Sequence, residues 1–162
     1  MKILIVGDVV GAPGRDAVKA LVPILRARHK LDFVIVNCEN AAGGAGVTPK
    51  TAQDLLSCPG IDMLTSGQHI WRYREIGPYM DAEPRLLKPA NYPKGTPGFG
   101  AHIYPTKNGQ KVGVVNILGR VFMGVEALDD PFRVGMEAIE KIRKETPVVI
   151  EDMHAEATSE KV

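Results

Sequence analysis

Four short apolar runs, each closed by polar residues, constrain the fold of this chain more than any other feature. Ile3–Val6 and 33–36 are continuous apolar runs, and 63–65 and 148–150 are shorter runs of the same kind. Continuous runs of this length are typical of strands that are buried on both faces. Helical patterns separate them, so the sequence predicts an α/β fold.

Helices are predicted from apolar spacing and from N-terminal signals. Apolar residues recur at helical intervals over 18–25, where Pro23 is expected to bend the helix. Thr48 followed by Pro49 is a typical start of a second helix. Asp130 followed by Pro131 marks a third, in which apolar residues recur at helical intervals; they are Phe132, Met136 and Ile139.

A hairpin is predicted in the second half of the chain. Asn108-Gly109 separates two apolar runs, 101–105 and 111–118. Asn-Gly between such runs is a strong signal for two antiparallel strands. With the strand–helix alternation of the first half, this predicts a mixed sheet, and the irregular segment 89–100 is predicted to be a long loop.

Polar residues follow all four apolar runs of the predicted sheet. In open α/β sheets, ligands bind at the carboxyl ends of the strands, so we expect these residues to meet at one site if the strands are parallel neighbours. Taken singly, each has an ordinary explanation as a turn residue, a cap or a partly buried histidine. The residues are Asp8 after the first run, Asn37, Glu39 and Asn40 after the second, Gln68 and His69 after the third, and Asp152 and His154 after the last.

The chemistry of this set suits a divalent metal centre. Carboxylates, amide oxygens and imidazoles are ligands for Mn, Fe or Zn. Two metals held together can clamp the attacking and leaving oxygens of a phosphoryl transfer, and Glu39 has two oxygens with which to bridge them. A histidine that is not bound to metal can protonate the leaving alkoxide.

Composition and other motifs exclude several classes of function. The chain has 162 residues, which predicts one domain over 1–162, and a net charge of +1 gives no signal for nucleic-acid binding. No apolar run is long enough for a membrane span and no signal peptide is evident, so a cytoplasmic location is expected. Neither a P-loop nor a G-x-G-x-x-G motif is present, which makes a Rossmann-like dinucleotide protein a remote alternative.

Six motifs, in order along the whole chain, carry a resemblance to a known family. They are MKILIVGDVVG with PGR within residues 1–15, ENAAGG at 39–44, PANYP with GTPG within 89–98, GRVFM at 119–123, DPFR at 130–133 and HAEATSEK at 154–161. Together they resemble the YmdB-like bacterial metallophosphoesterases. The resemblance implies a metallophosphoesterase α/β sandwich that acts on 2′,3′-cyclic nucleotides such as 2′,3′-cAMP, with a tendency to oligomerise.

The resemblance also implies roles for individual residues. Asp8, Glu39 and His154 would be metal ligands, with Glu39 bridging, and Asn40 would line a centre of two divalent ions, Fe or Mn first and Zn as a further option. His69 would be the acid that assists the leaving group. A metal-bound hydroxide would open one ester bond of the cyclic phosphate.

Three departures from the family pattern affect these expectations. Gln68 stands where the family has a metal-ligating Asn, one methylene shorter, so we expect a weakened site. Cys38 stands where the family has Gly. Three roles are open for it: a small apolar filler, a source of crowding in the turn before Glu39, or a soft metal ligand. The family also continues with a Gly-Thr-His-Thr-His segment that this chain lacks, so we expect part of the fold to be missing and activity to be reduced. The alternative is a non-catalytic module that binds a nucleotide or a protein.

Overall fold

The first half of the chain forms a parallel sheet. The computed structural model describes residues 1–162. Its strands β1 (Ile3–Val6), β2 (Phe33–Asn37) and β3 (Met63–Thr65) lie in the order β1-β2-β3, all parallel. The first three predicted strands are therefore confirmed, and their carboxyl ends lie at one edge of the sheet.

The second half forms a separate sheet of three strands. β4 (Ala101–Pro105) pairs antiparallel with β5 (Lys111–Leu118), which confirms the predicted hairpin. β5 pairs in parallel with β6 (Val149–His154). The predicted mixed sheet is confirmed in the second half of the chain. The expectation that all four apolar runs share one sheet is wrong, because the chain makes two sheets and the first is all parallel. The last strand also extends beyond the predicted 148–150, so His154 lies within β6 and not after it.

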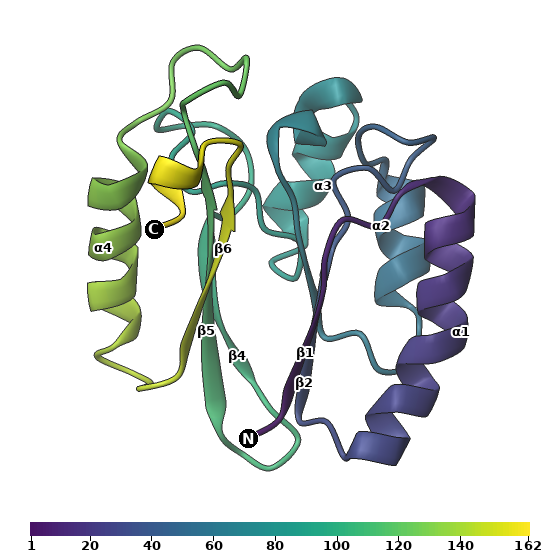
Figure 1. The fold of residues 1–162 in the computed structure, drawn as a ribbon. Coiled ribbons are helices and arrows are strands. Elements are labelled where there is room, and N and C mark those ends of the chain that lie inside the picture. Colours follow the sequence, from purple (N-terminus) through teal and green to yellow (C-terminus); the bar gives the residue numbers. More distant parts are fainter.

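The two sheets face each other and helices cover their outer faces (Figure 1). α1 (Gly11–His29) and α2 (Pro49–Leu56) lie against the first sheet, and α4 (Pro131–Ile142) lies against the second. The chain continues from β3 into a 3-10 helix, Gln68–Arg72, and then α3 (Ile76–Ala82). The α/β sandwich expected from the sequence is thus confirmed as an arrangement of layers. A second 3-10 helix, Thr158–Glu160, follows β6.

The alternation of side chains along β2 explains why an apolar core forms on each face of the first sheet. Phe33 and Ile35 point toward the second sheet, whereas Val34 and Val36 point toward the helices, as the two-residue period of a strand requires. The Phe33 ring lies 5.8 Å from that of Tyr104 on β4. Each large apolar side chain that is fully buried here contributes about 1.5–3 kcal/mol to folding, so the packing between the sheets holds them together.

Two helices begin at the predicted capping residues, and a third contains a proline. Thr48 caps α2 and forms a reciprocal capping box with Thr51, as its position before Pro49 predicts. Asp130 caps α4 by accepting a hydrogen bond from the Arg133 N–H. α1 continues through Pro23, the predicted point of bending. Pro23 has no N–H for the carbonyl of Lys19, and the Cys58 thiol lies 3.8 Å from that oxygen.

The predicted helix α4 is confirmed, but two of the apolar side chains at helical spacing on it are exposed. Phe132 and Met136 are 56% and 57% exposed, whereas Gly135 and Ile142 are buried. Helical spacing identifies the apolar side chains of a helix but not how much of them a three-stranded sheet can cover.

None of the helices combines the length and the apolar character that a membrane span needs.

Candidate metal and active site

Polar residues from both sheets meet beyond the carboxyl ends of the first sheet. Asp8 follows β1, and Glu39 and Asn40 follow β2. His69 lies on the 3-10 helix after β3, and His154 is the last residue of β6 in the other sheet. The structure therefore brings together five of the predicted site residues.

Glu39 and Asn40 are the centre of this group. Glu39 Oε1 lies 3.3 Å from His154 Nε2 and 3.5 Å from His69 Nδ1. The Asn40 amide nitrogen donates to Asp8 Oδ1 at 2.7 Å and to Glu39 Oε1 at 3.1 Å. One amide thus links two carboxylates, and the Glu39 carboxylate lies beside two imidazoles.

The hydrogen bond between Asn40 and His69 determines how the imidazole is presented. Asn40 Oδ1 lies 2.7 Å from His69 Nδ1, and an amide oxygen only accepts, so the proton lies on Nδ1. The other ring nitrogen, Nε2, has no hydrogen-bond partner in the chain, and the His69 side chain is 41% exposed. When the ring is protonated, Nε2 is available to donate a proton to a ligand.

Burial and charge act against each other at Glu39. The side chain is 3% exposed, and this burial raises its carboxyl pKa above the usual value. The nearby His154 and His69 oppose that shift, and the negative charge of Asp8 adds to it. A buried carboxylate of this kind gains from any cation that binds to it.

The turn that carries Glu39 and Asn40 is fixed by backbone hydrogen bonds. The Asn37 side chain accepts from the Glu39 N–H at 3.2 Å. The Gly11 N–H donates to the Asn40 carbonyl at 2.9 Å, so the start of α1 contacts the turn directly. Asn37, which the sequence placed among the polar residues of the site, therefore holds the turn from behind.

One buried asparagine, Asn116 on β5, connects the two sheets beside the site. It is fully buried; its Oδ1 accepts from the Ser66 N–H at 2.9 Å, and its amide nitrogen donates to the Asp152 carbonyl at 3.2 Å. Asn116 thus ties the end of β3 to β6, the strand that carries His154. The Asp152 side chain makes no hydrogen bond or ion pair with the other polar residues of the site.

Gly67 is needed for the close approach of Glu39. A Cβ at Gly67 would overlap Glu39 Oε2, and it would lie 2.7 Å from Glu39 Cδ and 2.9 Å from His154 Cδ2. Real Cβ atoms essentially never come so close to neighbouring atoms. Glu39 and His154 can occupy these positions only because residue 67 lacks a side chain. Sequence reasoning assigned no role to Gly67 or Asn116, because both act through contacts between segments that are distant in the chain.

Several buried oxygens at this end of the sheet lack a partner. Glu39 Oε2 and Gln68 Oε1 are both buried and make no hydrogen bond. The Tyr92 hydroxyl lies beside the Trp71 ring, and burial raises its pKa to about 12, with opposition from Trp71 and a smaller contribution from the charge of Glu39. An unpartnered buried polar atom costs about 1–3 kcal/mol, so each calls for an explanation, and a bound ion or water is one.

The donor set fits a divalent cation. Glu39 Oε2 and Gln68 Oε1 are unpartnered oxygens, and oxygen and imidazole donors suit Mn, Fe and Zn. No group of three His, Cys, Asp or Glu side chains is placed to hold a metal by itself. A cation here would therefore also use amide oxygens. The Asn40 oxygen faces His69 in this arrangement, so the amide would have to turn over to serve.

Cys38 is not directed into the site. The side chain is fully buried in the apolar cluster between the first sheet and its helices, and burial raises the pKa of its thiol. A thiol that stays protonated is a poor metal ligand. Of the three roles considered for Cys38, the packing favours that of a small apolar filler.

Comparison with known proteins assigns the chain to a family. The family model described as YmdB-like protein matches residues 4–162. The chain belongs to the YmdB-like family. The 2′,3′-cyclic-nucleotide 2′-phosphodiesterase of Bacillus subtilis is 48% identical to this YmdB-like chain over 162 residues, which are 100% of the chain and 60% of that protein.

Solved structures have the same fold. A hypothetical protein from Thermus thermophilus is 38% identical, with a TM-score of 0.84 over 99% of the YmdB-like chain and 60% of its own. A crystal structure titled as a novel phosphatase from Mycoplasma pneumoniae is 29% identical, with a TM-score of 0.87 over 99% and 57% of the two chains. The YmdB-like chain thus spans 57–60% of the length of these proteins.

Proposed function

We propose that the chain forms the metal-binding part of a phosphodiesterase that hydrolyses cyclic nucleotides such as 2′,3′-cAMP. The observation that carries this proposal is the buried Glu39 carboxylate, which lies between two imidazoles and keeps one oxygen without a partner. Such a site suits metal-dependent hydrolysis in general. The name of the Bacillus subtilis relative supports the narrower substrate class.

Two divalent cations, Fe or Mn in preference to Zn, are proposed as the cofactor. Glu39 would bridge them, and Asp8, Asn40, Gln68 and His154 would supply the other ligands. When bound, the cations supply positive charge to the phosphate oxygens and lower the pKa of water. The carboxylates and the buried position of Glu39 are what this chain contributes to that chemistry.

His69 is proposed to be the proton donor. Its Nδ1 is held by Asn40, and its Nε2 has no partner within the chain. Protonation of the ring leaves Nε2–H to donate to the alkoxide that leaves phosphorus when the cyclic ester opens. In the metal-free chain, Asn40 fixes the orientation of the ring, because it contacts both His69 and the carboxylates. Turned over to bind a cation through its oxygen, the amide would present its nitrogen to His69 Nδ1 instead.

The test is hydrolysis of 2′,3′-cAMP by the chain with added Mn²⁺ or Fe²⁺, followed by identification of the nucleoside monophosphate. We expect turnover that depends on metal and that falls by about 100-fold in His69→Ala. His29→Ala, at the end of α1, is the matched control and is expected to behave as wild type. Metal-independent turnover, or none at any metal concentration, would contradict the proposal; nucleotide binding without turnover would favour a binding module.

Gln68→Asn is expected to increase metal occupancy. Gln68 Oε1 is buried and unpartnered, and the side chain is one methylene longer than that of Asn, so shortening it should suit the strict distances of metal ligands. We expect Mn²⁺ to bind about tenfold more tightly, as measured by calorimetry. Gln53→Asn on the exposed face of α2 is the control. An unchanged affinity would show that Gln68 is not a ligand.

A further inference from the structure

Besides the Asn37 side chain, one other side chain tethers the turn that presents Glu39 and Asn40, and it comes from α1. Four successive carbonyl groups of the turn accept hydrogen bonds. The Cys38, Glu39 and Asn40 carbonyls accept from backbone N–H groups, those of Ala41, Gly46 and Gly11 respectively. The fourth, that of Ala41, accepts from the guanidinium Nη1 of Arg15.

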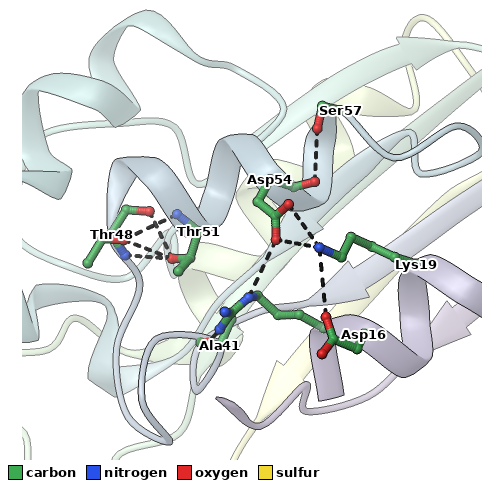
Figure 2. Close-up of polar contacts among 8 residues, drawn as sticks. Asp16, Lys19, Ala41, Thr48, Thr51, Asp54 and Ser57 are labelled. Atoms are coloured by element: carbon green, nitrogen blue, oxygen red, sulfur yellow. Dashed lines mark hydrogen bonds and ion pairs between the residues drawn. The ribbon is translucent and has the colours of Figure 1, made fainter. Parts of the chain in front are cut away.

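Arg15 is in turn held by a charged cluster between α1 and α2. Figure 2 shows the Lys19 and Asp54 part of this cluster. The Arg15 Nε lies 3.5 Å from Asp54 Oδ2 on α2. Asp54 also binds the Lys19 ammonium, with distances of 2.9 and 3.0 Å to its two carboxylate oxygens. The Arg15 side chain is 20% exposed, so this arrangement is partly shielded from water and less screened than a surface ion pair.

We propose that Arg15 is a positioning residue for the site: it fixes the turn of residues 38–46 so that Glu39 and Asn40 are held ready for their ligand. The inference rests on the proposed function. Arg15 contacts none of the polar side chains of the site. It acts through the Ala41 carbonyl, one residue after Asn40. Asp54 holds the guanidinium in the orientation that this hydrogen bond needs, because a planar guanidinium can serve a carboxylate and a carbonyl at once.

The glycine content of the turn explains why a side-chain tether would stabilise it. Gly43, Gly44 and Gly46 all have positive φ angles, of 65°, 95° and 89°. Such residues are entropically free in the unfolded chain and are costly to order. Without the guanidinium, the Ala41 carbonyl loses its partner and the glycine-rich part of the turn keeps only its backbone bonds. Loosening there reaches Asn40 and Glu39 directly, since they precede Ala41 by one and two residues.

The first measurement is amide hydrogen exchange of the metal-free chain. In Arg15→Ala we expect faster exchange confined to residues 38–46, and added guanidinium is expected to restore the protection. Arg28→Ala is the matched control, because Arg28 lies on the same helix, is exposed and makes no side-chain hydrogen bond or ion pair. Exchange that is unchanged over 38–46 would overturn the proposal, and so would exchange that rises evenly over the whole chain.

The second measurement is Mn²⁺ affinity by calorimetry. We expect Arg15→Ala to bind Mn²⁺ about tenfold more weakly than wild type, because residues that orient metal ligands commonly affect affinity on that scale. We expect Asp54→Asn to show a smaller loss of Mn²⁺ affinity. If Arg15→Ala does not fold, Arg15→Lys serves instead, since it keeps a donor for Ala41 but cannot also span to Asp54. Equal affinity in wild type and Arg15 variants would refute positioning and leave the proposed function intact. A wild-type chain that binds no Mn²⁺ would refute the function, and exchange would still decide the role of Arg15.

Discussion

Gly67→Ala is expected to abolish Mn²⁺ binding and phosphodiester hydrolysis. The added methyl group would overlap the Glu39 carboxylate and crowd His154, so both would be pushed from their positions. Overpacking of this kind costs about 1–3 kcal/mol of stability. Loss of affinity should be larger, about 100-fold or more, because two proposed ligands move at once. Calorimetry with Mn²⁺ and thermal unfolding of the metal-free chain measure the two effects separately.

Gly7→Ala is the matched control for this substitution. Gly7 also lies next to a proposed ligand, Asp8, but a Cβ at Gly7 meets nothing within 4 Å and its φ is not positive. We expect Gly7→Ala to bind Mn²⁺ as wild type does. Normal metal binding by Gly67→Ala would mean that Glu39 is not held against residue 67 in solution, and the proposed site would be wrong.

Glu39→Gln is expected to separate binding from stability. Glutamine has the same shape but carries no charge, so the variant should lose about 100-fold in Mn²⁺ affinity together with activity. The metal-free chain should unfold at the same temperature as wild type or slightly higher, because a buried carboxylate whose pKa is raised by burial no longer has to be desolvated. Paired calorimetry and thermal unfolding measure both quantities.

Glu151→Gln makes the same chemical change away from the site. Glu151 lies on β6, and burial raises the pKa of its carboxyl group as well. We expect this variant to keep wild-type Mn²⁺ affinity. If Glu39→Gln bound Mn²⁺ normally, or if both variants lost affinity equally, Glu39 would not be the bridging ligand.

Local patterns were enough to predict most elements of the fold. The apolar run Ile3–Val6 and the Asn108-Gly109 turn depend on neighbours in the sequence, and both predictions are confirmed. The separation into two sheets depends on which faces of β2 and β5 pack together, and periodicity contains no such information. The exposure of Phe132 could not be predicted for the same reason, because it depends on the width of the sheet beneath α4.

The predicted site shows the same division between local and long-range information. Asp8, Glu39 and His69 could be grouped in advance because parallel strands end at one edge. Gly67 could not be assigned, because its role is to leave room for a side chain from another loop. Arg15 was missed because it reaches the turn from α1, 26 residues away from Ala41 in the chain.

The contact between Glu39 and His154 joins the two halves of the molecule, since one residue follows β2 and the other ends β6. A ligand that binds both side chains acts as a reversible cross-link between the two sheets. It should therefore raise the free energy of unfolding of the whole chain with the logarithm of its concentration, by about 2.7 kcal/mol at 100 times its Kd. The unfolding temperature should rise with it. Resistance to heat would then report occupancy of the site without any assay of turnover.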